Sequence, residues 1–406
     1  MSYSEWEDQR LSEIVEITMG QSPKSEFYNQ NKVGKPFLQG NRTFGLKYPS
    51  FDTWCTNPKK IAKKNDVLMS VRAPVGDLNI ANKDLCIGRG LCSLRMKNEN
   101  NEFLYYLLEA NIKGIVNVET GSVFGSINKK TIESLKFKIP SIHEQKAIAN
   151  ILSSLDDKIE LNNKINKNLE EMAQALYKQW FVDFEFPNEE GEPYKSSGGA
   201  MIDSELGLIP NGWEVGSIGD YLETSLGGTP SRKKQEYWNG NINWINSGKI
   251  NDFRIVSESE KITDLGLSKS STKLLPRKTT VLAITGATLG QTSLLEIDSC
   301  SNQSVIGILE NDEVPYTYIF PMIQDKIDDL TSRQTGGAQQ HINKNDVNSF
   351  KMIKPRSHIL SDFHIIVSGI YDKIAVSLFE NMSIAETRDI LLPKLMSGEI
   401  EVPIKG

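Results

Sequence analysis

Cysteine, long apolar stretches and targeting signals are scarce or absent in this sequence. Only four cysteines occur in 406 residues, and none forms a C-x-x-C pair, so a disulfide framework is excluded and a reduced protein is indicated. No apolar run approaches the roughly 18 residues that cross a bilayer. The first six residues also lack the basic and apolar regions of a secretion signal. We therefore expect a cytoplasmic protein without membrane contact.

Enzyme motifs are missing as well. The chain contains no G-x-x-x-x-G-K-[ST] phosphate loop, no G-x-G-x-x-G between a strand and a helix, and no nucleophile elbow. Its four histidines have no cysteine or aspartate neighbours at metal spacing. We therefore expect no catalytic residue and no metal site, and instead a role in binding or organising other molecules.

The two halves of the chain resemble each other, which is the most informative feature of the sequence. Matched residues lie about 207 to 215 positions apart. The clearest matches are Trp6 with Trp213, Gln21-Ser22-Pro23 with Gly228-Thr229-Pro230, Gly76 with Gly290, Cys86 with Cys300, Ile127-Asn128-Lys129 with Ile342-Asn343-Lys344, and Asp157-Lys158-Ile159 with Asp372-Lys373-Ile374. A near-constant separation over so long a stretch predicts a tandem duplication. The match of Gly76 with Gly290 favours a shared turn over a phosphate-binding loop.

Each copy has the same internal order. Short β-branched runs broken by Gly, Pro and Asn clusters predict a mixed α/β domain of about 140 residues. A helical pattern follows over residues 141–181 in the first copy and 357–392 in the second, where Pro393 is expected to end it. Between the copies, residues 183–211 are acidic and rich in Gly, Ser and Pro, which indicates a surface connection rather than part of a core.

Both helical patterns have the heptad period of a coiled coil, although each alone is also consistent with an amphipathic helix on a globular core. The seam positions are Ile148, Leu152, Leu155, Ile159, Asn162, Asn166, Leu169, Ala173, Leu176 and Trp180, then Phe363, Val367, Ile370, Ile374, Ser377, Asn381 and Ile384. Because the first helix leaves one domain and the second begins at the other, direct pairing must be antiparallel. In that register Asn162 lies opposite Asn381. Asn166 then lies opposite Ser377, so we expect a polar layer that sets the register.

The formal net charge of -6 conceals an uneven distribution. Residues 1–141 hold 20 basic and 15 acidic side chains, a net charge of +5, and residues 211–356 hold 16 and 17, a net charge of -1. The remaining segments hold 10 and 20, a net charge of -10. Basic, Asn and Gln side chains on loops suit contacts to phosphates and base edges, although charged clusters are most often solvated surface. The two mixed domains are therefore the candidate nucleic-acid binders.

Several longer motifs resemble one protein family. They are Ile139–Ile148 (IPSIHEQKAI), Leu176–Phe184 (LYKQWFVDF), Leu206–Val215 (LGLIPNGWEV), Trp244–Gly248 (WINSG) and Leu392–Ile400 (LPKLMSGEI). With them the chain resembles, over essentially its whole length, the specificity (S) subunit of type I DNA restriction–modification enzymes. One departure is Gln21-Ser22-Pro23, which stands for the usual G-x-T-P. The other is His358–Ser361, which stands where the second helix normally repeats the E-Q of the first.

The resemblance implies an α+β fold in which two tandem-duplicated mixed α/β target recognition domains are joined by two long antiparallel coiled-coil helices with pseudo-twofold symmetry. The expected boundaries are 1–141 and 211–356 for the recognition domains, 142–182 and 357–396 for the spacer helices, 183–210 for the linker and 397–406 for the tail. Each domain would read one half of a bipartite double-stranded DNA target. The helices would set the spacing and dock two methyltransferase (M) subunits, and restriction (R) subunits would complete the complex. S-adenosylmethionine, ATP and magnesium would be required only by those partners.

Candidate site residues follow from the loops and from the family motifs. The DNA-contact candidates are Gln39, Asn41, Arg42, Lys47, Arg72, Arg89, Lys129, Ser247, Lys249, Arg277, Arg333, Gln339, Gln340 and Lys344. The helix motifs imply partner docking by Glu144, Gln145, Lys178 and Trp180. The absence of an NPPY- or DPPY-type tetrapeptide argues against a stand-alone modification enzyme. A coiled-coil adaptor or scaffold protein that does not bind DNA stays open as the alternative.

Overall fold

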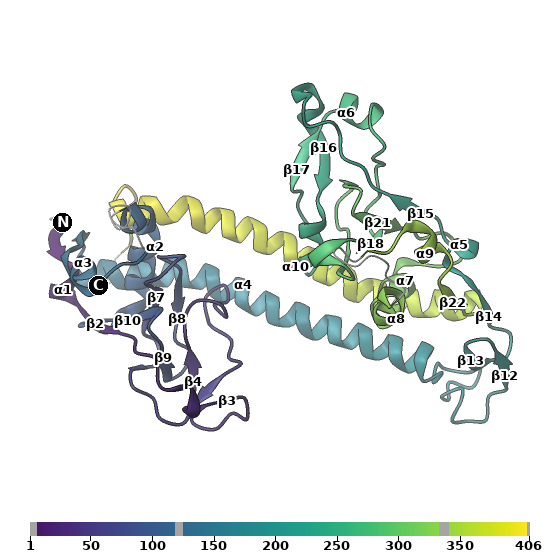
Figure 1. Cartoon of the computed structure of the whole chain (residues 1–406), viewed down its shortest axis with the longest axis horizontal. Helices are drawn as coiled ribbons and strands as arrows, with labels where there is room; N and C mark the ends of the chain where they lie inside the picture. Colours follow the sequence, from purple (N-terminus) through teal and green to yellow (C-terminus); the bar gives the residue numbers. More distant parts are fainter. Residues whose placement is uncertain (1–5, 118–124, 333–340, 404–406) are drawn as a thin grey trace. The chain divides into compact units, whose positions relative to one another are not determined.

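The computed structural model of the chain describes residues 6–117, 125–332 and 341–403, and it divides into two compact units (Figure 1). Unit 1 comprises Met1–Leu161 and Asn381–Gly406, and unit 2 comprises Asn162–Glu380. The division passes through both long helices, so each unit holds one mixed domain and a stretch of each helix. In the described ranges no helix is both long enough and apolar enough to cross a membrane.

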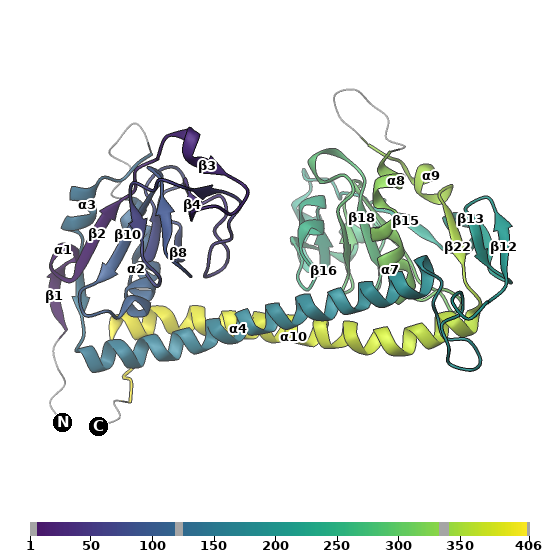
Figure 2. The ribbon, with the colours of Figure 1, turned by 90° about the horizontal axis from the view of Figure 1, so that it is seen from below.

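Unit 1 is built on a four-stranded antiparallel sheet, in the order β2 (Val15–Met19), β10 (Leu91–Met96), β7 (Val67–Ser70) and β8 (Leu78–Ile80). A second sheet has the order β3 (Tyr28–Asn29), β5 (Trp54–Cys55), β4 (Lys35–Leu38), β9 (Leu85–Ile87) and β6 (Ile61–Ala62), and β1 (Glu7–Arg10) pairs with β11 (Lys136–Ile139). The shorter helices are α1 (Leu11–Ile14), α2 (Asn101–Asn117) and α3 (Lys129–Ser134). Helix α2 lies between the four-stranded sheet and the long helices (Figure 2).

Unit 2 repeats this arrangement. Its four-stranded sheet has the order β15 (Thr224–Leu226), β21 (Val305–Ile308), β18 (Thr280–Ala283) and β19 (Thr292–Leu294), and β14 (Glu214–Ser217) pairs with β22 (Lys351–Lys354). The second sheet has the order β17 (Glu260–Ile262), β16 (Trp238–Ile245) and β20 (Cys300–Ser301). The short helices are α5 (Ile218–Tyr221), α6 (Asp264–Ser268), α7 (Tyr316–Asp325), α8 (Ile327–Thr331) and α9 (Lys344–Asn348), and a separate hairpin joins β12 (Met201–Ser204) to β13 (Gly207–Pro210).

Strand registers confirm the duplication residue by residue. In unit 1 the parallel pair β4–β9 aligns Phe37 with Cys86, and in unit 2 the parallel pair β16–β20 aligns Trp244 with Cys300. The matched glycines also share a conformation, because Gly76 has a φ of 97° and Gly290 a φ of 86°. Only glycine adopts this region without strain, so the shared turn predicted from the sequence is confirmed.

The repeated Ile-Asn-Lys motif has a structural reason in both units. Asn128 caps α3 by accepting from the Thr131 amide, and Asn343 caps α9 by accepting from the amides of Asn345 and Asp346. The preceding Ile127 and Ile342 are buried. Each motif therefore joins an N-cap to a core contact and starts a short helix at the same place in each domain.

The long helices are α4 (Ile142–Tyr177), which ends in a π-helical turn at Lys178–Val182, and α10 (Ser357–Ser397). Within each unit they run antiparallel and share a core, Leu152 with Leu392 in unit 1 and Ala173 with Val367 in unit 2. The expectation that Pro393 ends the second helix is wrong. Pro393 lies inside the last turns of α10 and is exposed, so its ring meets solvent on the outer face.

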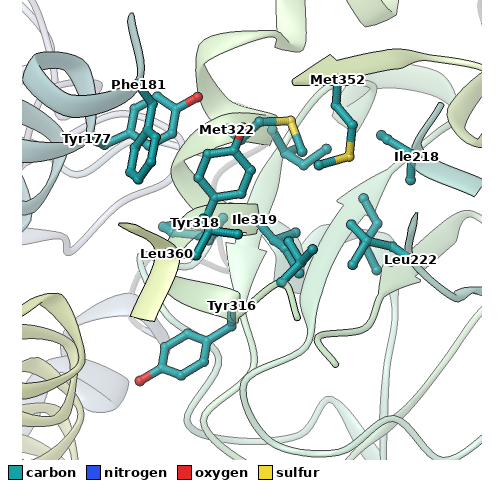
Figure 3. Close-up of a cluster of buried hydrophobic side chains, with 14 of the residues drawn as sticks. Tyr177, Phe181, Ile218, Leu222, Tyr316, Tyr318, Ile319, Met322, Met352 and Leu360 are labelled. Carbon is teal, nitrogen blue, oxygen red and sulfur yellow. The ribbon is translucent and has the colours of Figure 1, made fainter. Parts of the chain in front are cut away.

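The core of unit 2 joins the end of α4 to the mixed domain, as Figure 3 shows. Tyr177 and Phe181 point toward Tyr318 of α7, with ring centroids 5.9 and 4.8 Å from it. The following segment was expected to lie on the surface, but Phe186 is buried and stacks on Trp213 at 5.1 Å. Part of the linker is therefore core, because a few aromatic side chains among its many polar ones reach inward.

All four cysteines are free and buried. Burial raises the pKa of the Cys86 thiol to about 11, that of Cys92 to about 12 and that of Cys300 to about 11. These three thiols are therefore protonated near neutral pH and act as small apolar side chains.

Candidate nucleic-acid interface

Four loops meet at one end of the sheets in unit 1, and we call them loop cluster 1. They are Gly20–Pro23 after β2, Gln39–Asn41 after β4, Val71–Pro74 after β7 and Gly88–Gly90 between β9 and β10. Ser22 Oγ donates to Gln39 Oε1 at 2.8 Å, and the Arg89 amide donates to Ser22 Oγ at 3.2 Å. The Gly90 amide donates to the Gln39 carbonyl at 3.1 Å. These bonds hold exposed polar side chains from separate parts of the sequence beside one another.

Glycine is required where these loops approach most closely. A Cβ atom on Gly20 would lie 2.1 Å from the carbonyl oxygen of Gly88. A Cβ atom on Gly88 would lie 2.5 Å from Gln39 Oε1 and 2.9 Å from Gln39 Cα. The neighbouring Gly40 has nothing within 4 Å of its Cβ position. The packing of loop cluster 1 therefore depends on Gly20 and Gly88 but not on Gly40.

Four of the DNA-contact candidates belong to loop cluster 1: Gln39, Asn41, Arg72 and Arg89. Arg72 and Arg89 are exposed, and among the residues that the structure describes neither has an ion-pair partner. Asn41 donates to Asp77, and Arg42, one residue further on, pairs with Asp52. The hydrogen bond from Arg42 holds the pKa of the Asp52 carboxyl below its usual value. Arg72 and Arg89 are thus the cations of this cluster that remain available to an anion.

Unit 2 has the equivalent arrangement, which we call loop cluster 2. Its loops are Gly227–Pro230 after β15, Asn246–Ser247 after β16, Ile284–Gln291 between β18 and β19, and Asn302–Ser304 after β20. Thr229 Oγ1 donates to Gln303 Oε1 at 2.6 Å, the Gly228 amide to the Ser301 carbonyl at 2.7 Å and the Ile284 amide to the Ser304 carbonyl at 2.9 Å. By position in the duplication Thr229 corresponds to Ser22 and Gln303 to Arg89.

Sequence reasoning missed Ser22, Thr229, Asn246 and Gln303. Asn246 accepts through its side chain from the amides of Gly248 and Lys249, which starts the turn containing Ser247. Ser22 and Thr229 occupy matched positions in the two copies, next to Pro23 and Pro230. The signal for these residues is the duplication, because they lie at positions matched to loop residues of the other copy.

Of the remaining candidates in both units, Ser247 lies in loop cluster 2. Lys249 follows two residues later and is half-buried. Its Nζ is already bonded within the fold, 2.8 Å from Asp252 and 3.0 Å from Ser257. Lys129 and Lys344 are the first residues of α3 and α9, and Lys129 pairs loosely with Glu133 at 3.6 Å. Arg333, Gln339 and Gln340 lie outside the described residues.

Two of the candidates prove to bind the long helices instead. Lys47 is 1% exposed, and its Nζ donates to Asp157 of α4 at 2.9 Å, so the prediction of a DNA contact there is wrong. Burial would lower the pKa of Lys47, but the hydrogen bond to Asp157 and nearby negative charges raise it. Arg277 lies 3.2 Å from Glu296 and 3.7 Å from Asp372 of α10, so its guanidinium is occupied by carboxylates as well.

The residues expected to dock partners are mostly used inside the fold. Gln145 is buried, donates to the Pro140 carbonyl and accepts from Asn98. Trp180 is buried with its ring 5.5 Å from Phe363, so neither Gln145 nor Trp180 offers a surface to a partner and both predictions are wrong. Glu144 accepts from the amide and hydroxyl of Ser141, which caps α4. Lys178 pairs with Asp183 at 2.7 Å.

The expected polar layer is buried in the long helices. Asn162, Asn166, Ser377 and Asn381 are 4%, 1%, 5% and 9% exposed. Within unit 2, Asn162 Nδ2 donates at 2.8 Å to Glu380, the residue before Asn381. Among the described residues, neither the two amide atoms of Asn166 nor the Ser377 hydroxyl has a hydrogen-bond partner. Their role in setting the register stays a prediction.

No cluster suited to a metal ion occurs in the described parts of the chain, taken as three or more His, Cys, Asp or Glu side chains in one place.

Comparison with known proteins gives one consistent result. A family model described as the type I restriction modification DNA specificity domain matches residues 3–171 and again 210–368. The MjaIX specificity subunit of a type I restriction enzyme from Methanocaldococcus jannaschii is 26% identical over 98% of this chain and 94% of its own length. The HindI specificity subunit from Haemophilus influenzae is 28% identical over 98% of this chain and all of its own. The crystal structure of a type I restriction–modification S subunit from M. genitalium superimposes with a TM-score of 0.60 at 16% identity, covering 100% of this chain and 98% of that one, which supports the fold.

Proposed function

The chain belongs to the family of type I restriction–modification DNA specificity domains, and we propose that loop clusters 1 and 2 each read one half of a bipartite sequence in double-stranded DNA. The observation that carries this proposal is the duplication of the site itself. Two equivalent domains present the same set of loops, while the exposed side chains differ: Arg89 in one stands where Gln303 stands in the other. The same arrangement of loops carrying different exposed side chains is suited to two half-sites of different sequence.

The exposed side chains suit base reading in the major groove. Arginine bonds two acceptors of guanine, whereas glutamine pairs with the donor and acceptor of adenine. Arg89 and Gln39 in loop cluster 1, and Gln303 in loop cluster 2, are therefore the proposed base contacts. Arg72 and the first-turn residues Lys129 and Lys344 are suited to phosphates, which would hold each domain on the duplex.

Apolar side chains on the outer faces of the long helices support the docking of partner proteins. In unit 2, Val376 is 63% exposed, Ile365 69% and Met172 55%, and in unit 1 Ile390 is 61% exposed. Contiguous exposed apolar side chains are a feature of protein-interaction surfaces, so these positions are candidates for one. We assign them to methyltransferase (M) subunits, and restriction (R) subunits would join the full complex. Methylation, cleavage and the need for S-adenosylmethionine, ATP and magnesium would belong to these partners.

The DNA-reading proposal is tested by sequencing modified sites in cells that carry this chain with its methyltransferase partners. Arg89→Ala should weaken modification about 10- to 100-fold at sites defined by one half of the motif, and Gln303→Ala should do so for the other half. Lys113→Ala, an exposed change on α2 outside both loop clusters, is the control and should leave the motif intact. A wild-type chain that directs no sequence-specific modification and shifts no DNA with its partners would favour the adaptor alternative.

Partner docking is tested separately by co-purification. Val376→Asp should reduce recovery of the methyltransferase subunits at least about tenfold because it sets a charge in an apolar contact. Val376→Thr, of the same shape and without charge, should retain most of the recovery. Equal recovery with both variants would remove Val376 from the docking surface.

A further inference from the structure

In each unit the mixed domain projects a buried cation from a matched loop onto the long helices. Lys47 in unit 1 is 1% exposed and Arg254 in unit 2 is 3% exposed. They occupy matched places: each lies the same number of residues beyond the matched strands β4 and β16. The backbone beside each cation is joined to the equivalent strand, although the donor differs. In unit 1 the Ile80 amide of β8 donates to the Lys47 carbonyl at 2.8 Å, and in unit 2 the amide of Ile255, which follows Arg254, donates to the Leu294 carbonyl of β19 at 3.0 Å.

The two cations meet different partners. Lys47 Nζ donates at 2.9 Å to Asp157 of α4, whose side chain is 62% exposed, and lies 5.7 Å from the Tyr48 ring. Arg254 pairs with Glu170 of α4, whose side chain is only 8% exposed. Its guanidinium also lies over the rings of Phe320 and Tyr371, at 4.4 and 5.0 Å. Tyr371 is on α10, so Arg254 contacts both long helices at once.

Apolar packing between a mixed domain and the long helices of its unit is only one of the forces that set the orientation of the domain. Apolar contacts are non-directional, so they define the orientation of a domain less sharply than a hydrogen-bonded ion pair does. A buried charge is different, because moving it away from its partner leaves an unpaired ion in a low-dielectric site, which is strongly unfavourable. The pair Arg254–Glu170 therefore penalises any change of orientation that the apolar core around it would tolerate.

We propose that Lys47 and Arg254 are positioning residues, which fix the orientation of each DNA-reading domain on its stretch of the long helices and so determine which spacing between the two half-sites is accepted. The proposal rests on the proposed function in that both loop clusters read DNA. One extra base pair between the half-sites moves one of them along the DNA axis by the rise of one base pair. It also rotates that half-site about the axis by about a tenth of a helical turn. A domain held by a directional ion pair would reject that change, whereas a freely tilting one would accept it.

The difference between the two partners predicts unequal effects. Glu170 is buried and Asp157 is largely in solvent, so loss of the cation leaves a stranded charge only in unit 2. The Arg254 variant should therefore relax spacing more than the Lys47 variant. This order would not follow from DNA contacts, since neither side chain is accessible to DNA.

The experiment uses the full chain in complex with its methyltransferase subunits and a panel of duplexes that carry both half-sites at spacings from two base pairs shorter to two longer than the wild-type optimum. Arg254→Met and Lys47→Met keep the length of the side chain and remove the charge. The preference for the optimal spacing over a spacing changed by one base pair should fall at least about fivefold for Arg254→Met and less for Lys47→Met. The half-site sequences should stay the same.

Controls separate this proposal from instability and from failure of the proposed function. Lys167→Met removes an exposed cation that pairs with Glu171 on α4 at 3.8 Å and should leave spacing unchanged. If Arg254→Met does not fold, Arg254→Lys keeps the charge, loses the planar fork and should relax spacing to a smaller extent. Unchanged spacing preference in the folded variants overturns the proposal while DNA reading stands. Absence of any sequence preference in the wild-type complex overturns the proposed function first.

Discussion

Arg388 of α10 donates from Nη1 to Oδ1 of Asp156 on α4 at 2.8 Å, inside unit 1. The other carboxylate oxygen of Asp156 accepts from the Tyr106 hydroxyl at 2.5 Å. Asp156 is 3% exposed and thus links both long helices to α2, the helix that covers the four-stranded sheet. One buried carboxylate therefore joins the three elements on which the DNA-reading domain of unit 1 rests.

Removing the positive charge of Arg388, which pairs with Asp156, should destabilise unit 1. Arg388→Met leaves Asp156 charged, buried and short of its ionic partner, which should lower the free energy of unfolding by about 3 kcal/mol. Tyr106→Phe removes one hydrogen bond and should cost about 1–2 kcal/mol. Denaturant unfolding of the full chain measures both. Lys129→Met, which removes an exposed cation, serves as the control, and equal midpoints for it and Arg388→Met would contradict this account.

The stability of unit 1 should depend on pH through Glu109 of α2. Burial raises the pKa of this carboxyl to about 7, with Asp156 and Asp389 adding to the rise and Arg388 opposing it. Its Oε2 atom is buried and has no hydrogen-bond partner in the part of the chain that the structure describes. Between pH 4.5 and pH 7 the Glu109 carboxyl therefore keeps a proton in the folded state. In the unfolded state, where its pKa is near 4.5, it has already released that proton. The contribution to stability is full below pH 4.5 and is lost as pH rises toward 7.

Glu109→Gln tests this dependence. The neutral amide should remove the loss of stability between pH 4.5 and 7, a loss of at most about 3 kcal/mol, and make the variant the more stable protein at pH 8. Unfolding midpoints of wild type and variant across this range give the comparison. Parallel pH profiles for the two proteins would show that another group carries the effect.

A leucine in place of Asn166 should stabilise unit 2. Both amide atoms of Asn166 are buried, and neither they nor the Ser377 hydroxyl have a hydrogen-bond partner within residues 6–117, 125–332 and 341–403. Asn166→Leu removes that desolvation cost and should raise the free energy of unfolding by about 1–2 kcal/mol. Asn168→Leu, at an exposed position of α4, controls for the higher helix propensity of leucine. A lower stability for Asn166→Leu than for this control would mean that the polar layer is satisfied in solution.

Two glycines of loop cluster 1 allow a matched test of its geometry. Gly88→Ala sets a Cβ atom 2.5 Å from Gln39 Oε1 and must displace that side chain, whereas Gly40→Ala meets nothing within 4 Å. Gly88→Ala should therefore reduce modification at least about tenfold through the half-site read by unit 1 and leave the other half-site unchanged. Sequencing of modified sites reads out both. Equal motifs for the two variants would show that Gln39 is not held by this contact.

The fold could be predicted from the sequence to the extent that it is repeated. Matched pairs such as Cys86 and Cys300 mark equivalent strands, because a position that must be small and apolar in one copy must be so in the other. Pro393 misled the prediction of a helix end, since a proline in an outer-facing position of a long packed helix is tolerated. The aromatic residues of the linker were hidden by its polar composition, because composition averages over the few side chains that reach a core.

The candidate site could be predicted only in part, and Lys47 shows why. A basic side chain on a loop has the same local sequence signal whether it faces DNA or a carboxylate, and the carboxylate of Asp157 is far away along the chain. The same holds for Gln145 and Trp180, because a family motif does not show whether its side chains face a partner or the inside of the fold. Those motifs mark the ends of α4, where the side chains build the junction between helix and domain rather than an outer surface.

The buried thiols have a practical consequence for spectroscopy. Because all four native cysteines are shielded and three of them have raised pKa values, maleimide dyes should react very slowly with the native chain. One cysteine introduced on an exposed loop of each unit would then be the preferred site of labelling, with no need to replace the native ones. Energy transfer between the two dyes could follow how the chain responds when a duplex engages one half-site and then the other.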